Sequence, residues 1–549
     1  MKKLTTLLLL LSLSLPLLAV PPTIREPSLS ISSDLQKSLL ETAPHKLKNQ
    51  PIINNFYFQH HYQPLWFTTH GFKQEKIRTF LRYVHDDVTL NYRGYIYQES
   101  QRLIDMLNRR VSKKEALQLE LRLTALYYEF LQHTIYGEID WASFNATLRG
   151  LESQNIQANW EQYAPQFDVI ELMSHENIMQ TIYTMTPKHY RYQSLVTALR
   201  RLHQIKAQGA WKPLPYFKRL RLGDRNYLVS QLRERLRISG DYQECQANPL
   251  AQNPLFDGCL KVAVERFQSR HDLTVDGIVG AGTRAMLNQP IEKKIAQVLL
   301  NIDRIKWLKP ENSERYIVVN LPEFLLHYVE NQQESKTFKV IVGDRMHPTP
   351  IFSNSISYIV LNPYWKVPEG IVKREIVPHM IEDPNYITNQ GLQAHMTWAE
   401  ESAIVPLDQI NWSDYLQEGN NFPYRLMQPP GPRNALGKIK FKFPNRFSVY
   451  LHDTPTKHLF NRKIRAFSHG CIRLSNPHSL LESIAMVDEN IDLFEADNIL
   501  MGKAKKQLNV AHKIPIHLIY LTAGVNANNQ LIFRKDIYNY DNYQKRFIR

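Results

Sequence analysis

Residues 447–452 read FSVYLH and residues 468–474 read SHGCIRL, and these two stretches decide how the C-terminal half of the chain is interpreted. The first alternates between apolar and polar positions, which predicts a β-strand with Tyr450 and His452 on one face. The second places Cys471 directly after a glycine, which lets the backbone approach a substrate closely. A cysteine nucleophile needs a nearby base and backbone donors for an oxyanion. The two stretches supply candidates for both.

The length of 549 residues predicts three or four domains, at about 150 residues per domain. Hydrophobic residues make up 43% of the chain and charged residues 22%, which excludes collagen-like, coiled-coil and wholly disordered chains. A change to strand-like periodicity predicts that a β-rich domain begins near residue 312. Its expected strands are residues 316–321, 324–329, 338–342, 356–361 and 447–452.

The region before this domain is predicted to be mostly helical. Residues 20–50 contain prolines and a serine-rich run, so we interpret them as a linker. Residues 51–220 are expected to form a helical scaffold, whose clearest helix begins at a capping box that starts with Ser112. The spacing of its apolar residues predicts a buried stripe of Leu119, Leu123, Leu126 and Phe130. Residues 290–311 contain one more amphipathic helix, over 291–307, which we expect to rejoin the scaffold.

Residues 221–289 have a different pattern, with two amphipathic helices, an insertion between them, a turn that reads DGIVG at 276–280, and a short third helix. Gly277 and Gly280 permit a tight turn that places the third helix across the other two. The segment resembles the three-helix peptidoglycan-binding domain over about 65 residues. The resemblance implies binding to cell-wall glycan. The alternative is a helical spacer, or a module that has lost its binding.

The stretches around His452 and Cys471 resemble the signature of the L,D-transpeptidase family. Their flanks match as well, with NPYWKVP at 362–368 and PPGPRNALG at 429–437. With the helical region and the embedded module, the chain resembles the large multidomain L,D-transpeptidases of Gram-negative bacteria. The expected fold class is multidomain α+β, with a helical scaffold, a three-helix peptidoglycan-binding domain and a mostly β catalytic domain at 312–504. A C-terminal extension at 505–549 would add a strand at 519–523.

The resemblance implies roles for single residues. Cys471 would be the nucleophile and His452 the base, with the backbone amides of Gly470 and Cys471 as oxyanion donors. We expect supporting roles for two residues of the motif, Ser468 and His469. Substrate-binding roles are expected for Tyr450, Arg473 and Trp365. The alternatives are an inert buried thiol at Cys471 and a structural ion pair at Arg473. The group that orients His452 stays open between Asp453 and a backbone carbonyl.

A long segment of about 60 residues connects the two flanking motifs, and the part at 375–428 is interpreted as a lid. It contains two histidines and two tryptophans, namely His379, His395, Trp398 and Trp412. We expect a mobile cover that grips the substrate with aromatic faces rather than a packed independent core. The alternative is a distal decoration that does not contact the substrate.

The chain begins with two lysines and an apolar stretch that ends near Ala19, so residues 1–19 are interpreted as a secretory signal peptide. The alternative is an uncleaved anchor, which would associate the chain weakly with the inner membrane. The 67 basic and 52 acidic residues give a net charge of +15, which favours an anionic partner. A periplasmic location excludes nucleic acid, so peptidoglycan stem peptides and glycan are the expected partners.

The three cysteines are an odd number for an exported chain. Cys245 and Cys259 lie 14 positions apart in one segment and are the candidates for a disulfide, which leaves Cys471 as a free thiol. The sequence contains no H-E-x-x-H or comparable metal-binding spacing, so neither a metal nor another cofactor is expected.

The resemblance implies acyl transfer on peptidoglycan stem peptides. The Cys471 thiolate, paired with the imidazolium of His452, would attack the carbonyl of the third residue of a tetrapeptide and release D-alanine. An amine of a second stem would then form a 3-3 cross-link, and carbapenems would acylate the same thiol. Two alternatives use other acceptors, either water in an L,D-carboxypeptidase or a protein amine in a protein-to-wall attachment enzyme. A third, of a different class, is a non-catalytic wall-binding scaffold.

Overall fold

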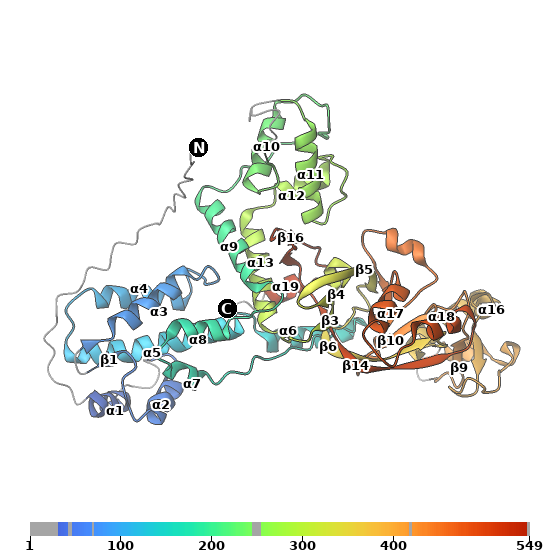
Figure 1. Cartoon of the computed structure of the whole chain (residues 1–549), viewed down its shortest axis with the longest axis horizontal. Helices are drawn as coiled ribbons and strands as arrows, with labels where there is room; N and C mark the ends of the chain where they lie inside the picture. Colours follow the sequence, from blue (N-terminus) through green and yellow to red (C-terminus); the bar gives the residue numbers. More distant parts are fainter. Residues whose placement is uncertain (1–30, 42–46, 69–70, 244–253, 417–419, 546–549) are drawn as a thin grey trace. The chain divides into compact units, whose positions relative to one another are not determined.

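The computed structural model describes residues 31–41, 47–68, 71–243, 254–416 and 420–545. The predicted signal peptide at 1–19, most of the predicted linker and Cys245 lie outside the described residues. The chain forms two compact units. The first comprises residues 1–138, 164–188 and 192–208, and the second comprises 139–163, 189–191 and 209–549 (Figure 1).

The first unit is helical and is built around its longest helix, α5 (Lys113–Tyr136). The predicted capping box at Ser112 is confirmed, because its hydroxyl accepts from the Glu115 amide and the Glu115 carboxylate accepts from the Ser112 amide. The predicted stripe of α5 is buried. The other elements of the unit are α1 (Ile31–Glu41), α2 (Gln50–Gln59), β1 (Phe67–Thr68), β2 (Gly71–Phe72), α3 (Gln74–Asp86), α4 (Tyr95–Leu107), α7 (Val169–Ser174), α8 (Ile178–Met185) and α9 (Tyr192–Ala207).

The buried carboxylate of Glu120 connects the centre of α5 to the preceding chain. It accepts hydrogen bonds from the Tyr57 hydroxyl at 2.6 Å and from the amides of Leu65 and Trp66 at 2.5 and 3.0 Å. Burial raises the pKa of Glu120 to about 7. The carboxylate therefore serves as a polar centre of this unit's core.

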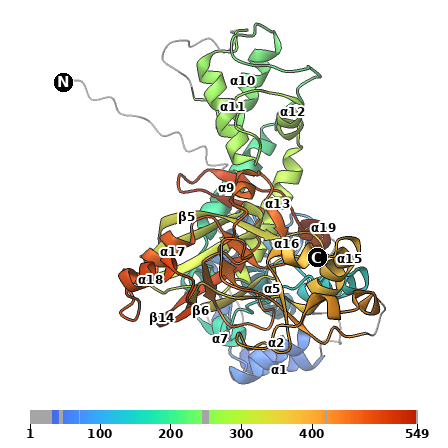
Figure 2. The same cartoon turned by 90° about the vertical axis from the view of Figure 1, so that its right-hand side faces the viewer.

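Three helices of the second unit form the predicted small module: α10 (Leu228–Ile238), α11 (Gly258–Arg270) and α12 (Ala281–Leu287). They lie side by side in Figures 1 and 2 and share a hydrophobic core of their own. The turn before α12 needs a glycine, because Gly277 has a φ of +68°. The Gln268 side chain holds that turn by accepting from the Gly277 amide at 2.9 Å and donating to the Ile278 carbonyl at 2.9 Å.

A nine-stranded mixed sheet forms the centre of the second unit. Its strand order is β12-β5-β13-β11-β10-β6-β14-β3-β4. The strands are β3 (Arg315–Asn320), β4 (Leu325–Glu330), β5 (Gln333–Gly343), β6 (Phe352–Leu361), β10 (Ile439–Lys442), β11 (Leu451–His452), β12 (Ala466–Ser468), β13 (Ile472–Leu474) and β14 (Lys506–Ile519). The helices α17 (Pro477–Ala485) and α18 (Leu493–Met501) share its hydrophobic core.

The C-terminal region differs from the prediction. The prediction of a strand at 519–523 is wrong, because β14 ends at Ile519. A separate hairpin of β15 (Ala523–Val525) and β16 (Leu531–Phe533) follows it. The strand β14 lies between β6 and β3, so part of the region interpreted as an extension is a central strand of the sheet. The chain then forms α19 (Tyr540–Lys545).

Two helices expected in the scaffold belong instead to the unit that holds the sheet. These are α6 (Trp141–Gly150) and α13 (Ile291–Lys306). In α6, Trp141 and Phe144 pack into the same hydrophobic core as the sheet. In α13, the buried Arg304 forms an ion pair with Asp541 of α19 at 2.8 Å. The prediction that α13 rejoins the scaffold is therefore wrong. The helix lies in the second unit, where its buried Arg304 is paired with Asp541 of α19.

The predicted strand at 447–452 is confirmed only at its end, since β11 comprises two residues. The Asn445 side chain accepts from the amides of Phe447 and Val449 and donates to the Val449 carbonyl. These local hydrogen bonds replace the ladder of a strand and form a turn in which Ser448 has a φ of +56°.

The segment between the two flanking motifs folds on a core of its own, contrary to the expectation of a cover without one. Its hydrophobic cluster includes Val377, Ile387, Leu426 and the buried Trp412. A three-stranded sheet of β7 (Trp365–Lys366), β9 (Arg425–Gln428) and β8 (Gln393–His395) joins its ends. Its helices are α14 (Glu369–Ile371), a π-helical turn (Val372–Ile376), α15 (Val377–Glu382) and α16 (Tyr386–Gln390). We call residues 365–428 the inserted subdomain.

None of the helices in the described part of the chain combines the length and the apolar character that crossing a membrane requires.

Candidate active site

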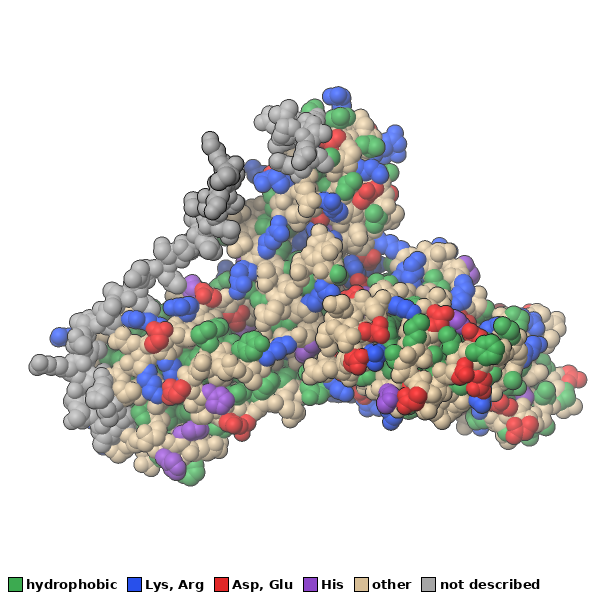
Figure 3. Space-filling view, viewed as in Figure 1, with side chains coloured by type: hydrophobic (Ala, Val, Ile, Leu, Met, Phe, Trp, Pro, Cys, Tyr) green, Lys and Arg blue, Asp and Glu red, His purple; other side chains and the backbone are tan. Residues whose placement is uncertain are grey.

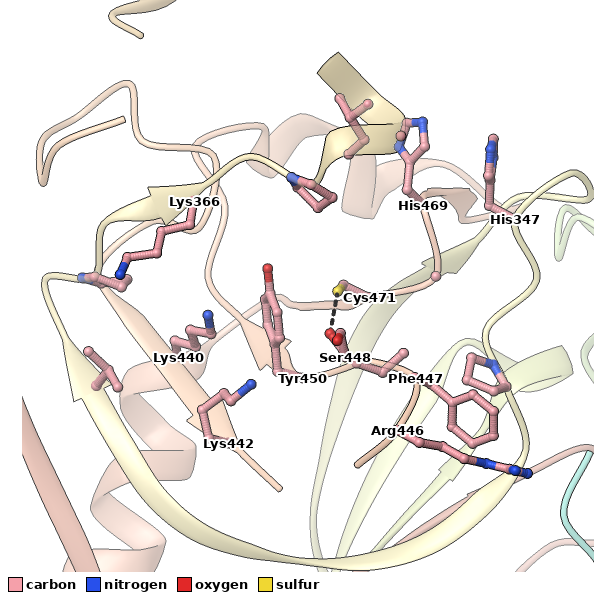
Figure 4. Close-up of a pocket in the computed structure, with 18 of the residues that line it drawn as sticks. His347, Lys366, Lys440, Lys442, Arg446, Phe447, Ser448, Tyr450, His469 and Cys471 are labelled. Carbon is pink, nitrogen blue, oxygen red and sulfur yellow. Dashed lines mark hydrogen bonds between the residues drawn. The ribbon is translucent and has the colours of Figure 1, made fainter. Parts of the chain in front are cut away.

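A cavity of about 920 Å³ opens beside Cys471 in the second unit (Figure 4). Its floor is one face of the sheet, contributed by β6, β10 and β14. One wall is the stretch 447–450 before β11, and another is residues 366–374 of the inserted subdomain. Within the predicted lid at 375–428, Glu400 lines the cavity. The part of the inserted subdomain that lines the cavity therefore begins before residue 375, where the predicted lid starts.

Parallel pairing of β11 with β13 brings the two signature stretches together. His452 lies opposite Arg473, and the Ile472 amide donates to the Tyr450 carbonyl at 3.1 Å. Since side chains alternate along a strand, Tyr450, His452, Cys471 and Arg473 share one face of the sheet. The sequence separation of 19 positions between His452 and Cys471 becomes spatial proximity through this pairing.

Cys471 is a free cysteine, and its sulfur faces the cavity. The Sγ donates to the Ser448 carbonyl at 3.9 Å, the contact drawn in Figure 4. Burial raises the pKa of the thiol, while hydrogen bonds from Tyr450 and the charges of Lys440 and Lys442 oppose that rise. The groups that favour the thiolate are therefore the tyrosine and the two lysines.

His452 is buried and is oriented by a backbone carbonyl. Its Nδ1 lies 2.5 Å from the Asp453 carbonyl oxygen, which can only accept, so Nδ1 carries the proton and Nε2 is the free base. The Asp453 carboxylate instead accepts from the Lys438 amide at 2.9 Å and from Lys457 at 2.5 Å. Of the two orienting groups left open by the sequence, the carbonyl is the one in contact.

The protonation states differ from the expected thiolate–imidazolium pair. Burial and the neighbouring Arg473 lower the pKa of His452 to about 3, so the imidazole is neutral at neutral pH. The pKa of Cys471 is raised, which favours the neutral thiol. Among the described residues no hydrogen bond joins the two side chains. The resting site therefore holds a neutral thiol beside a neutral imidazole.

The turn that carries Cys471 is held by several polar contacts. Gly470 has a φ of +99°, a conformation that favours glycine. Its carbonyl accepts from the Thr349 hydroxyl at 2.9 Å. The buried Ser468 hydroxyl donates to the Cys471 carbonyl at 2.5 Å. These contacts occupy the carbonyls on both sides of the Gly470–Cys471 bond, and the role of the two amides as oxyanion donors stays a prediction.

His469 points away from Cys471 in Figure 4, in keeping with a supporting role. Its Nε2 contacts the Glu375 carboxylate of the π-helical turn. Its ring packs against the His347 ring, with centroids 4.5 Å apart. The contacts of His469 thus connect the turn that carries Cys471 to the inserted subdomain, and π-helical turns are frequent at functional sites.

The three expected substrate-binding residues occupy different places. Tyr450 lines the cavity, with its ring 5.6 Å from that of His452. Arg473 is not among the described residues that line the cavity, and its guanidinium donates to the Thr456 hydroxyl at 3.4 Å. Trp365 packs against the core of the inserted subdomain. The roles proposed for these residues stay predictions.

The two lysines beside the thiol were not predicted from the sequence. Lys440 and Lys442 lie on β10, where the stretch IKFK alternates apolar and basic residues. That alternation could have identified them, because it predicts a strand with both lysines on one face. Of the predicted disulfide pair, Cys259 is disulfide-bonded and Cys245 lies outside the described residues, so the pairing stays a prediction. Within the described part of the chain, no group of three or more histidine, cysteine or acidic side chains could hold a metal ion.

Comparisons with known proteins agree with this geometry. Residues 314–487 match a family described as the L,D-transpeptidase catalytic domain. Residues 51–199 match a "Scaffold domain" family, and residues 225–287 match a "Putative peptidoglycan binding domain" family.

A curated relative from Haemophilus influenzae, named "Putative L,D-transpeptidase", is 32% identical over 251 residues. The match covers 46% of this chain and 49% of the relative, so the chain spans about half the length of the curated protein it matches.

Solved structures with some likeness include L,D-transpeptidases from Stackebrandtia nassauensis and Xylanimonas cellulosilytica. They are 12% and 14% identical, cover 56% of this chain and 97% and 99% of theirs, and have TM-scores of 0.21 and 0.17. Scores of this size carry no argument about the present fold. The match at 314–487 contains both signature stretches and the strands that join them. Residues 314–487 are therefore similar to the catalytic domain of L,D-transpeptidases, and residues 225–287 are similar to the family described as "Putative peptidoglycan binding domain".

Proposed function

We propose that the protein is an extracytoplasmic peptidoglycan L,D-transpeptidase that forms 3-3 cross-links through a Cys471 acyl-enzyme. The observation that carries the proposal is the free thiol of Cys471 in a large cavity, on a glycine turn and on the same sheet face as the neutral, buried His452. A neutral imidazole can accept the thiol proton when a substrate carbonyl arrives.

The first step would acylate the enzyme. Nε2 of His452 takes the Sγ proton as the sulfur attacks the carbonyl carbon of the third residue of a donor tetrapeptide. The amides of Gly470 and Cys471 would stabilise the negative charge on the carbonyl oxygen. The C–N bond then breaks, the imidazolium returns its proton to the leaving amine, and D-alanine departs from a thioester.

The second step would regenerate the thiol. The side-chain amine of a second stem attacks the thioester carbonyl and gives one proton to Nε2 of His452. The C–S bond breaks, and the proton returns to Sγ as the new amide forms. The Asp453 carbonyl keeps the ring in one tautomer through both steps, since it bonds Nδ1 and leaves Nε2 free.

The inserted subdomain is proposed to cover the donor stem in this reaction. Its residues 366–374 form a cavity wall, and its Glu375 contacts His469 of the nucleophile turn. Because the subdomain has its own core, it would act as a rigid wall rather than a flexible flap. The peptidoglycan-binding domain would hold the glycan strand that carries the stem.

Incubation of the full chain with purified disaccharide-tetrapeptides, followed by mass spectrometry, tests the proposal. We expect cross-linked dimers together with free D-alanine, and neither with the Cys471→Ala variant. Tripeptide and D-alanine without dimer would indicate water as the acceptor. Unchanged substrate from the wild-type protein would refute the enzyme assignment and favour a wall-binding scaffold.

A further inference from the structure

The cavity beside Cys471 has a one-sided charge. Among the described residues that line it, six are basic and one is acidic. The basic residues are Lys366, Arg374, Lys440, Lys442, Arg446 and Lys505, and the acidic residue is Glu400. On the surface visible in Figure 3, by contrast, basic and acidic side chains are interspersed. The excess of basic over acidic side chains is therefore greater at this cavity than in the chain as a whole.

Two of these basic groups already have a carboxylate partner. Lys505 pairs with Glu400 of the inserted subdomain, and Arg446 pairs with Glu161 at 2.8 Å. Lys440 and Lys442 form no ion pair with any carboxylate in the described part of the chain. Both ammonium groups instead approach the ring of Tyr450, at 3.8 and 5.0 Å from its centroid.

The strand β10 fixes these two side chains at the cavity. Ile439 and Phe441 are buried in the sheet core, so the alternate residues Lys440 and Lys442 face the cavity. Lys440 pairs in register with His452 of β11, which places it in the same cross-strand row as the proposed base. In Figure 4 both lysines point into the cavity beside Tyr450. A rigid strand positions a charge more precisely than a loop does.

Two half-buried ammonium groups without a counter-charge are costly. Burial and the charges of Lys442, Lys366 and Lys505 lower the pKa of Lys440 to about 8. Among the described residues, the one negative group that raises the pKa of Lys440 is Cys471 when ionised, and the thiol is neutral at rest. An anionic group on a ligand would restore the charge balance.

We propose that Lys440 and Lys442 form a carboxylate-binding subsite that recognises the terminal carboxylate of the residue leaving the donor stem. The inference rests on the proposed function, in which Cys471 attacks the peptide bond directly before that residue. A terminal carboxylate is separated from the scissile nitrogen by a single α-carbon, so the two lysines beside the thiol are within its reach. The subsite would select stems with a free terminal carboxylate and position the scissile carbonyl over Sγ.

The test compares two donor tetrapeptides that differ only at the C-terminus, one with a free carboxylate and one with a carboxamide. The measured quantity is the preference ratio, kcat/KM for the carboxylate divided by kcat/KM for the carboxamide, from release of the terminal residue. A charge-assisted hydrogen bond predicts a wild-type ratio of about 10 to 100. The ratio cancels any effect of the lysines on the reactivity of the thiol, since both peptides use the same nucleophile.

Lys440→Gln and Lys442→Gln should each lower the ratio toward about 1 to 3, mainly through slower turnover of the carboxylate peptide. Lys440→Arg keeps the charge and should keep most of the preference. Lys339→Gln removes an exposed lysine of β5 outside the cavity and is the matched control, with the wild-type ratio expected.

Equal turnover of both peptides by the wild-type protein would overturn the subsite while leaving the proposed function intact, and this comparison needs no variant. A ratio that stays at the wild-type value in both glutamine variants would overturn it too, even if both rates fall. Turnover of neither peptide by the wild-type protein would instead refute the proposed function, and the subsite with it.

Discussion

The pH dependence of Cys471 alkylation tests the protonation states derived for the site. Burial holds the pKa of the thiol above its usual value of 9.0, so less than about 1% is thiolate at pH 7. The rate of reaction with iodoacetamide should therefore rise about tenfold per pH unit, or about 1,000-fold between pH 6 and pH 9. A thiolate held by an imidazolium would instead react at nearly the same rate across this range.

The variant His452→Asn separates the two cases further. Its amide nitrogen can retain the hydrogen bond to the Asp453 carbonyl, and it removes the base at Nε2. Because His452 is neutral, with a pKa lowered to about 3, the variant should alkylate within about threefold of the wild-type rate and yet fail to turn over stem peptides. The assay is loss of free thiol by intact mass, from pH 5 to pH 10.

Two results would refute this reasoning. One is a wild-type alkylation rate that is flat between pH 6 and pH 9. The other is a fall of more than about 100-fold at pH 6 in His452→Asn, because that would show the histidine stabilising a thiolate. The same pKa also predicts the acid limb of turnover. Since the imidazole stays neutral down to about pH 4, kcat/KM should not fall between pH 7 and pH 5 on account of His452.

Further perturbations probe other parts of the chain. A carbapenem should add its mass to the wild-type protein and not to Cys471→Ala, as intact-mass spectra would show. Alkylation without reductant should modify one cysteine, and three modified cysteines would reject the Cys245–Cys259 bridge. Replacement of residues 375–428 by a Gly-Ser loop should impair stem turnover far more than alkylation by iodoacetamide, and equal cross-linking rates would show that the segment is no cover. Glu120→Ala leaves the buried amides of Leu65 and Trp66 without their acceptor and should lower the free energy of unfolding by about 2 kcal/mol or more, measured by urea denaturation with Glu120→Gln as the milder control.

Local signals in the sequence predicted local structure well. The capping box at Ser112 and the stripe that follows it define α5, because both act within one helix. The turn at Gly277 followed from its need for a left-handed conformation. The free thiol of Cys471 followed from the odd number of cysteines, two of which lie close together in one segment. Each of these features depends on residues close in the chain.

Features that depend on distant partners were not predicted. The amphipathic face of α13 predicted that the helix is packed on one side, but it did not identify the partner. The buried Arg304 of α13 pairs with Asp541 of α19, which lies more than 200 positions later in the chain. The strand expected at 447–450 was lost to side-chain hydrogen bonds of Asn445, which hydrophobic alternation does not register. The segment at 375–428 was expected to lack a core, because its apolar residues are spread among polar ones and gather only on folding.

The lysines of β10 connect the positive charge of the cavity to the proposed roles of Cys471 and His452. Lys440 stands in register with His452, and its ammonium contributes to lowering the pKa of that imidazole while favouring the thiolate of Cys471. The same charge therefore adds to the effects of burial and Arg473 in lowering the pKa of the imidazole, and it favours the thiolate of Cys471 once the proton has moved. Because both effects come from a strand whose other face is buried in the core, they do not require a flexible element to close first. In the proposed mechanism, charge control would come from the sheet, and the inserted subdomain would hold and cover the substrate.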